Sequence, residues 1–313
     1  MIVQKTLSRL LTAAFGVALA LGTAAPAKAI TIYATFDTTI SSDPNHAAIE
    51  ATIDQAIAMY EAAITTNISV NITYAEMTSG LGQSSTYYGT ITYSQYLAAL
   101  QSHSSGDAVD VAALASLPGG SANPVNGNTQ IDVTTANLRA LGFSAVVPTD
   151  STVSINTSIT NYGGSYSSSY YSLLAVIEHE MDEALGLGSS LDNGTTGPIR
   201  PEDLFRYSAP GVRSYTTSSS ATAYFSVNGG TTNLIGFNQS GGGADYGDWA
   251  SSGTAHVQDA FGTPGASPTF GIEQAALDSI GYNFASPVPE PASVWMFAMG
   301  GAILLAAYRR RVG

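Results

Sequence analysis

Residues 170–188 carry the clearest helical pattern in the chain, and the stretch ends in a pair of glycines. On a wheel of about 100° per residue, one broad apolar arc contains Leu173, Leu174, Ile177, Met181, Ala184 and Leu187. Glu178 and Asp182 fall on the far side of the wheel, where we expect water to solvate them. Glu180 falls inside the edge of the apolar arc, where a buried carboxylate is costly unless a cation or hydrogen bonds compensate it.

The rest of the chain contains both strand patterns and helix patterns. The predicted strands are residues 30–36, 68–74 and 151–155, with a hairpin formed by 223–227 and 232–237. The predicted helices are residues 44–64, 94–102, 107–117, 136–141 and 272–282. Two stretches rich in small and polar residues, 78–93 and 119–128, are predicted to be loops.

The polar residues of the central helix have a spacing that suits metal chemistry. Residues at i and i+4 point the same way, so His179 and Glu183 can hold one metal ion between them. Glu180 lies beside that ion, where it can take a proton from a metal-activated water. The alternative is that these acidic residues and the histidine form an ordinary solvated helix face.

The motif His179-Glu180-x-x-Glu183-x-x-Gly186 resembles the zinc-protease motif HExxHxxGxxH of the metzincins. In this chain Glu183 stands at the second histidine position and Ser189 at the third. Three further blocks resemble a family of secreted bacterial metalloprotease-like proteins: residues 202–208, 257–261 and 276–282.

This resemblance implies a metzincin-like α+β catalytic domain over residues 30–284, in which helices pack on a twisted sheet. It also implies zinc as the cofactor and a peptide or protein as the substrate. It implies that Glu180 is the general base and that His179 and Glu183 are metal ligands. The third ligand stays open at this point. Asp192 and His256 are candidates, and Asp203 is a weaker one.

The charge and the absence of cysteine limit the function classes. Between residues 30 and 289 the chain has 22 acidic residues and four arginines, a net charge of −18. Such a surface repels nucleic acid and anionic lipid, so no nucleic-acid partner is expected. With no cysteine in the chain, the fold is stabilised by a packed core or by bound ions rather than by disulfides.

Both ends of the chain carry targeting patterns. Residues 1–29 have a charged start, a short apolar run and the small-x-small sequence Ala27-Lys28-Ala29, which predicts cleavage by signal peptidase. The tail, residues 285–313, contains Val288, Pro289, Glu290 and Pro291, then an apolar run at 292–308 and three arginines at 309–311.

The tail resembles a PEP-CTERM sorting signal, which an exosortase-type enzyme processes. Its apolar run is predicted to be a transmembrane sorting helix, with the arginines holding its end on the cytoplasmic side. A plain membrane anchor is the alternative. The predicted path is export through the inner membrane, transient anchoring, and delivery to the cell surface or the medium.

Three functions are compatible with these patterns. The first is an exported zinc-dependent metalloprotease that hydrolyses peptide bonds through metal-activated water. The second is a surface or extracellular-matrix protein that keeps a protease scaffold without catalysis. The third is a calcium-binding adhesin, suggested by the acidic charge and by the loops at 192–194 and 245–248.

Overall fold

The computed structural model describes residues 29–163, 166–240, 244–251 and 253–285. The strands are β1 (Thr31–Phe36), β2 (Ser69–Glu76), β3 (Gly82–Thr86), β4 (Tyr88–Thr92), β5 (Gln130–Thr134), β6 (Ser151–Ile155), β7 (Thr160–Asn161), β8 (Tyr171–Ser172), β9 (Arg206–Ala209), β10 (Val212–Arg213), β11 (Tyr224–Phe225) and β12 (Ile235–Gly236). The α-helices are α1 (Thr38–Ser41), α2 (His46–Ala63), α3 (Tyr93–His103), α4 (Ala108–Ser116), α5 (Thr135–Ala140), α6 (Leu173–Leu185) and α7 (Glu273–Ser279). Three short 3₁₀ helices are η1 (Thr157–Ile159), η2 (Ser190–Asn193) and η3 (Pro201–Phe205). The α+β class predicted from the sequence is confirmed.

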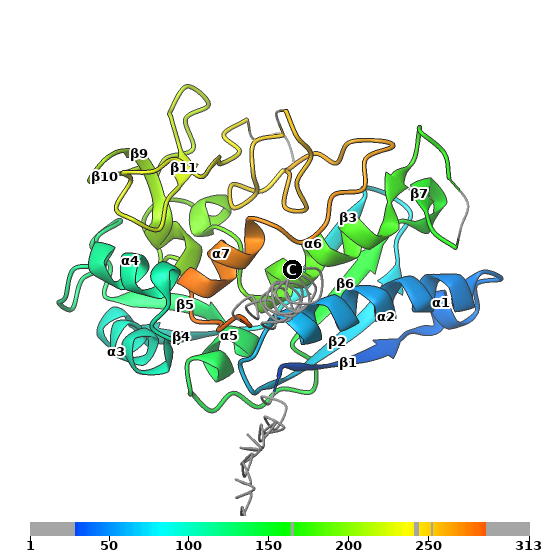
Figure 1. Cartoon of the computed structure of the whole chain (residues 1–313), viewed down its shortest axis with the longest axis horizontal. Helices are drawn as coiled ribbons and strands as arrows, with labels where there is room; N and C mark the ends of the chain where they lie inside the picture. Colours follow the sequence, from blue (N-terminus) through cyan, green and yellow to red (C-terminus); the bar gives the residue numbers. More distant parts are fainter. Residues whose placement is uncertain (1–28, 164–165, 241–243, 252, 286–313) are drawn as a thin grey trace, which may run out of the picture.

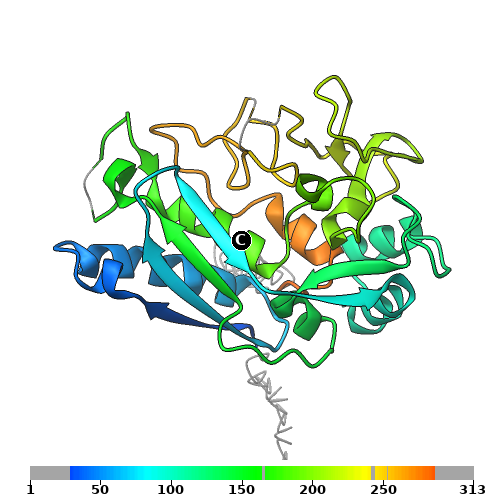
Figure 2. The same cartoon turned by 180° about the vertical axis from the view of Figure 1, so that it is seen from behind.

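The main sheet has the strand order β1-β2-β6-β3. β1, β2 and β6 run parallel, and β3 pairs antiparallel with β6 at one edge. Alternate residues of β2, namely Val70, Ile72 and Tyr74, are buried, as period-2 alternation requires of a strand with one covered face. Helices α2 and α6 cover that face, and the view from behind shows the other side of the sheet (Figures 1 and 2).

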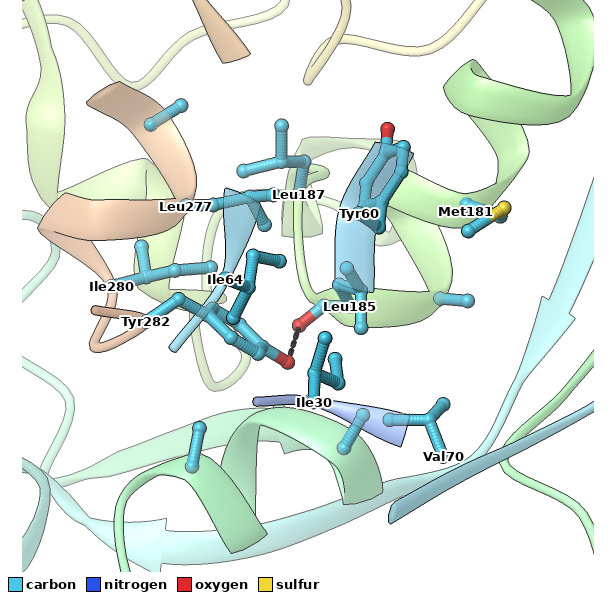
Figure 3. Packing of buried hydrophobic residues seen from close by; sticks show 14 of the residues in the cluster. Ile30, Tyr60, Ile64, Val70, Met181, Leu185, Leu187, Leu277, Ile280 and Tyr282 are labelled. Atoms are coloured by element: carbon cyan, nitrogen blue, oxygen red, sulfur yellow. Dashed lines mark hydrogen bonds between the residues drawn. The ribbon is translucent and has the colours of Figure 1, made fainter. Parts of the chain in front are cut away.

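The core joins the start of the domain to its end (Figure 3). Ile30 and Ile64 pack with Leu277 and Ile280 of the α7 region in one apolar cluster. The hydroxyl of Tyr282 donates a hydrogen bond of 2.7 Å to the carbonyl oxygen of Leu185. The last turn of α6 is thereby fixed against the C-terminal part of the domain.

The prediction that Glu178 and Asp182 are solvated is wrong. Both are fully buried. The hydroxyl of Tyr60 on α2 donates to Oδ1 of Asp182 at 2.7 Å and to the carbonyl oxygen of Glu178 at 2.9 Å. Because α2 and the loops near α7 cover the side of α6 that the wheel leaves to solvent, this helix has two buried sides.

The prediction of a loop over residues 78–93 is also wrong, because this segment contains β3 and β4. Strand β5, which pairs antiparallel with β4, has no counterpart in the predicted elements. Alternation of apolar residues is weak in β3, since its outward side chains are exposed and its inward ones are only half-buried. Pairing with β6, a tertiary contact, gives this segment its extended form.

The last third of the domain is rich in loops that pass over α6 (Figure 1). A second sheet has the order β10-β9-β11-β12, and the predicted hairpin is present in shortened form as β11 paired antiparallel with β12. Among the described residues, no helix is both long enough and apolar enough to cross a membrane. The predicted signal peptide and sorting helix lie outside the described residues, apart from Ala29 at the start of the domain.

Candidate metal centre

His179 presents one ring nitrogen to a group of carboxylates. Its Nδ1 lies 3.0 Å from the carbonyl oxygen of Val257. Because a carbonyl oxygen can only accept, Nδ1 carries the proton and Nε2 is directed toward the opposite side. A backbone carbonyl in this position orients many metal-ligating histidines. Val257 belongs to the block 257–261 that the sequence analysis singled out.

Three side chains converge around Nε2 of His179. Oε1 of Glu183 lies 3.8 Å away and Oδ1 of Asp248 lies 3.7 Å away. One ligand atom from each of the three residues lies within 4.8 Å of the others, so together they could hold a metal ion. Glu183 comes from the same face of α6, as the i, i+4 spacing predicts, whereas Asp248 comes from the loop that passes over the helix.

Hydrogen bonds from neighbouring elements hold both carboxylates in place. Ser84 on β3 donates through Oγ to Oε2 of Glu183 at 2.6 Å. Gln258 donates through Nε2 to Oδ1 of Asp248 at 3.2 Å. The main sheet therefore supports one carboxylate, and the overlying loop supports the other.

Glu180 lies at the edge of this group, as its wheel position predicts. Its side chain is buried, and its Oε2 has no hydrogen-bond partner among the described residues. Gly82 of β3 makes room for it, because a Cβ at position 82 would collide with Oε1 of Glu180 and lie 2.8 Å from Cγ1 of Val176. The strand and the helix approach so closely here that any larger residue would require the side chains of Glu180 and Val176 to shift.

The carboxylates and the imidazole perturb one another strongly. Burial by itself lowers the pKa of His179, but the carboxylates of Asp248, Glu180 and Glu183 outweigh it and raise the pKa to about 10. Burial raises the pKa of Asp248 to about 8, and burial raises the pKa of Glu180 well above its ordinary value. Without a cation, protons offset the negative charge in this group. A divalent cation would take their place, and its binding would release them.

None of the third ligands considered from the sequence joins this group. Asp203 accepts hydrogen bonds from Ser189 Oγ and from the backbone N–H of Ser190, so it fixes the chain after α6 instead. Asp192 is exposed in η2. His256 lines a hollow next to His179 but is not among the three converging residues. The third member of the converging group is Asp248, which the sequence suggested only as part of a possible calcium loop.

Two hollows meet at His179, Glu180 and Gly82. One is lined mainly by apolar side chains, including Val176 and Tyr171, and has a volume of about 110 Å³, enough for one side chain of moderate size. The other is polar, and Glu183 and Asp248 are part of its lining. The candidate metal centre therefore lies where a ligand can reach it from two sides.

Comparison with known proteins identifies the C-terminal segment. Residues 287–311 match the model of the PEP-CTERM protein-sorting motif. The match contains Val288, Pro289, Glu290 and Pro291 and the arginines at 309–311. No curated protein and no solved structure matches the chain. The metzincin-like fold predicted from the sequence therefore stays a prediction.

The sorting motif assigns the chain a destination. The protein is exported, has a C-terminal sorting and anchoring region, and is processed by an exosortase-type enzyme. Its place is the cell surface or the extracellular medium.

Proposed function

We propose that this exported protein is a zinc-dependent hydrolase of peptide bonds. The observation that carries the proposal is the convergence of His179, Glu183 and Asp248 beside the buried carboxylate of Glu180. A bound zinc ion would activate water and polarise the carbonyl group of a peptide.

The donor set fits zinc. Catalytic zinc sites take imidazole nitrogen and carboxylate oxygen among their donors, and they use three protein ligands with one position left open. Two ligand atoms on a tetrahedral zinc ion are about 3.4 Å apart, given metal–ligand distances of about 2.1 Å. The separations of 3.7 and 3.8 Å from His179 Nε2 are close to that value.

Glu180 is the group placed to move a proton. It is not one of the three converging residues, yet it lies beside them and lines both hollows. Burial and the neighbouring Glu183 raise its pKa well above the ordinary value, and a bound cation would lower this pKa again, so that the carboxylate is ionised and able to accept a proton. A carboxylate with these properties can accept a proton from water and pass it to the leaving amine.

The edge strand β3 supports a peptide as the substrate. The backbone N–H of Asn156 donates to the carbonyl oxygen of Leu81, and that of Tyr87 donates to Asp150. In an antiparallel pair such bonds fall on alternate residues, so the backbone groups of Gly82 and Ser84 face away from β6. An extended peptide can add to such an edge through main-chain hydrogen bonds, and Gly82 would place it beside Glu180.

The test pairs zinc content with casein hydrolysis in the wild type and in Glu180→Gln. The substitution keeps the shape of the side chain and removes its ability to accept a proton. We expect Glu180→Gln to keep bound zinc and to lose about 10²- to 10⁴-fold in hydrolysis. His179→Ala should lose zinc and hydrolysis together.

Two results would overturn the proposal in different ways. Wild-type hydrolysis by Glu180→Gln would remove the role assigned to Glu180. A wild type that binds no zinc and cleaves no casein would favour a non-catalytic surface protein with the same scaffold.

A further inference from the structure

A second group of carboxylates joins α4 to α7, away from His179. Oxygen atoms of Asp107, Asp110 and Asp278 lie within 4.8 Å of one another. Asp107 is the N-cap of α4, Asp110 lies in its first turn, and Asp278 lies near the end of α7. Two helices therefore bring three like charges together instead of separating them.

The first two carboxylates are held by the chain around the start of α4. Oδ1 of Asp107 accepts from the backbone N–H groups of Val109 and Asp110 at 2.8 and 3.0 Å. Oδ2 of Asp110 accepts from Ser105 Oγ at 2.8 Å and from Gly106 N at 2.9 Å. These bonds fix the direction of both side chains before any ligand arrives.

Asp278 lacks comparable support. Its side chain is 4% exposed, and its Oδ1 has no hydrogen-bond partner among the described residues. Within the part of the chain that the structure describes, none of the three carboxylates forms an ion pair with a lysine, arginine or histidine. The Asp278 side chain shares a hydrogen bond with that of Asp107, but its Oδ1 stays buried without a donor. Burying such an oxygen is unfavourable, and a positively charged ligand between the three carboxylates would offset that cost.

We infer that Asp107, Asp110 and Asp278 form a calcium site that ties α4 to α7. The donors are all oxygen atoms, the set that hard cations such as Ca²⁺ prefer and that zinc does not require. Asp107 is only half-buried and Ser105 and Gly106 are exposed, so the ion can enter from solvent. An exported protein meets free calcium outside the cell, where calcium modules bind with dissociation constants of about 10⁻⁴–10⁻³ M.

The site also accounts for the stability of a chain without disulfides. α7 carries Glu273, whose Oε1 accepts from Trp249 Nε1 and from the backbone N–H of Gln258, both at 3.1 Å. Those residues adjoin Asp248 and Val257 of the candidate metal centre. A calcium ion that fixes α7 would thus stabilise the loop over α6, although the inference does not depend on the proposed hydrolase activity.

The experiment compares melting temperatures of the exported chain in EGTA and in 5 mM Ca²⁺, for the wild type and for Asp278→Asn. At that concentration we expect calcium to raise the wild-type melting temperature by about 2 to 8 °C. Asp278→Asn should melt at or above the wild-type temperature in EGTA, because a like charge is gone, and should show no calcium shift. Equilibrium dialysis with ⁴⁵Ca²⁺ should show one bound ion fewer in the variant.

Two control variants separate this site from others. Asp54→Asn removes an exposed carboxylate of α2 and should keep the full calcium shift. His179→Ala should keep it too, so failure of the zinc proposal would leave this result untouched. The inference is overturned if calcium leaves the wild-type melting temperature unchanged, or if Asp278→Asn responds as the wild type does. The first result would mean that the carboxylates share a proton, in agreement with the pKa of Asp278, which burial and the other two carboxylates raise to about 8. The second would mean that calcium acts at another site.

Discussion

Gly82 and Glu180 approach so closely that a larger residue at position 82 would require the Glu180 side chain to move. A methyl group there would displace the Glu180 carboxylate or push β3 away from α6. We therefore predict that Gly82→Ala lowers casein hydrolysis by about 10- to 100-fold, since a misplacement of about 1 Å can reduce a rate by 10². Zinc content should stay near that of the wild type, because none of the three ligands is altered.

The matched control is Gly119→Ala. A Cβ at position 119 would have no neighbour within 4 Å, and this glycine has no positive φ. It should retain wild-type hydrolysis. Full activity in Gly82→Ala would contradict the close approach of β3 and Glu180.

Ser84 is the residue that orients Glu183. Its hydroxyl donates a short hydrogen bond to Oε2, which leaves Oε1 directed toward His179. We predict that Ser84→Ala weakens zinc binding by about 10- to 100-fold, the usual effect of losing a partner that orients a ligand. Competition with a zinc-sensitive dye measures this affinity.

The neighbouring Ser85 supplies the control for this experiment. It is exposed and points to the opposite side of β3. Ser85→Ala should bind zinc as the wild type does. Equal affinity in all three proteins would show that Glu183 does not need Ser84, or is not a ligand.

At the residue scale, the sequence predicts those candidate ligands that lie on one helix. His179 and Glu183 share a face because of the i, i+4 spacing, and Glu180 lies at the edge of that face as its wheel position predicts. Asp248 could not be chosen in the same way. Its position depends on how a long loop crosses α6, and no local pattern distinguishes it from the other acidic residues downstream. The one indication in the sequence is the block 257–261, which resembles the metalloprotease-like family. Its first residue, Val257, accepts a hydrogen bond from His179.

At the element scale, α6 is unusual because acidic residues occupy both of its sides. Burial raises the pKa of Glu178 to about 7, with Glu273 adding to the effect. Its folded-state pKa therefore lies above the value of about 4.3 expected in the unfolded chain. The native state holds this proton more tightly, so this group makes stability fall as pH rises from about 4.5 to 7.

Glu178→Gln removes this dependence. We predict that in EDTA the variant is more stable than the wild type by roughly 1 to 3 kcal/mol at pH 8, and that the difference shrinks toward pH 5. Urea unfolding at both pH values measures it. Asp54→Asn, a change at an exposed site, should leave the pH dependence as it is. A difference that does not vary with pH would mean that Glu178 is charged in the folded protein.

The errors made from sequence at this scale have one physical cause. A helical wheel assumes that a helix has one buried side, but α6 is enclosed by the sheet, by α2 and by loops. β3 and β4 were missed because their strand conformation comes from pairing and not from an apolar pattern. The strands and helices with strong periodicity, such as β1, β2, β6 and α2, were predicted within a few residues.

At the scale of the whole molecule, an acidic body is joined to a sorting tail. The tail could be identified from sequence because it is a linear motif that an enzyme reads in order, without a folded context. The arrangement of the domain could be predicted only as α+β, since the strand order and the loops over α6 depend on contacts between distant segments.

The tail leads to a prediction about release. In a host that has the sorting enzyme, Glu290→Ala should leave the protein in the membrane fraction, whereas Ser293→Ala, just after the Pro289-Glu290-Pro291 sequence, should be processed as the wild type is. Fractionation and mass spectrometry of the released protein measure this outcome. Released wild-type protein that still carries residues 309–311 would contradict processing at the motif.

The central claim is that His179, Glu183 and Asp248 bind one metal ion, and anomalous diffraction at the zinc edge from crystals of the zinc-loaded protein tests it most directly. We predict a single strong peak at about 2.0–2.3 Å from His179 Nε2, Glu183 Oε1 and Asp248 Oδ1. The peak should disappear in Asp248→Ala crystals grown under the same conditions. A wild-type map without a peak at these three atoms, or with the peak beside Asp192, His256 or Asp203, would contradict the account.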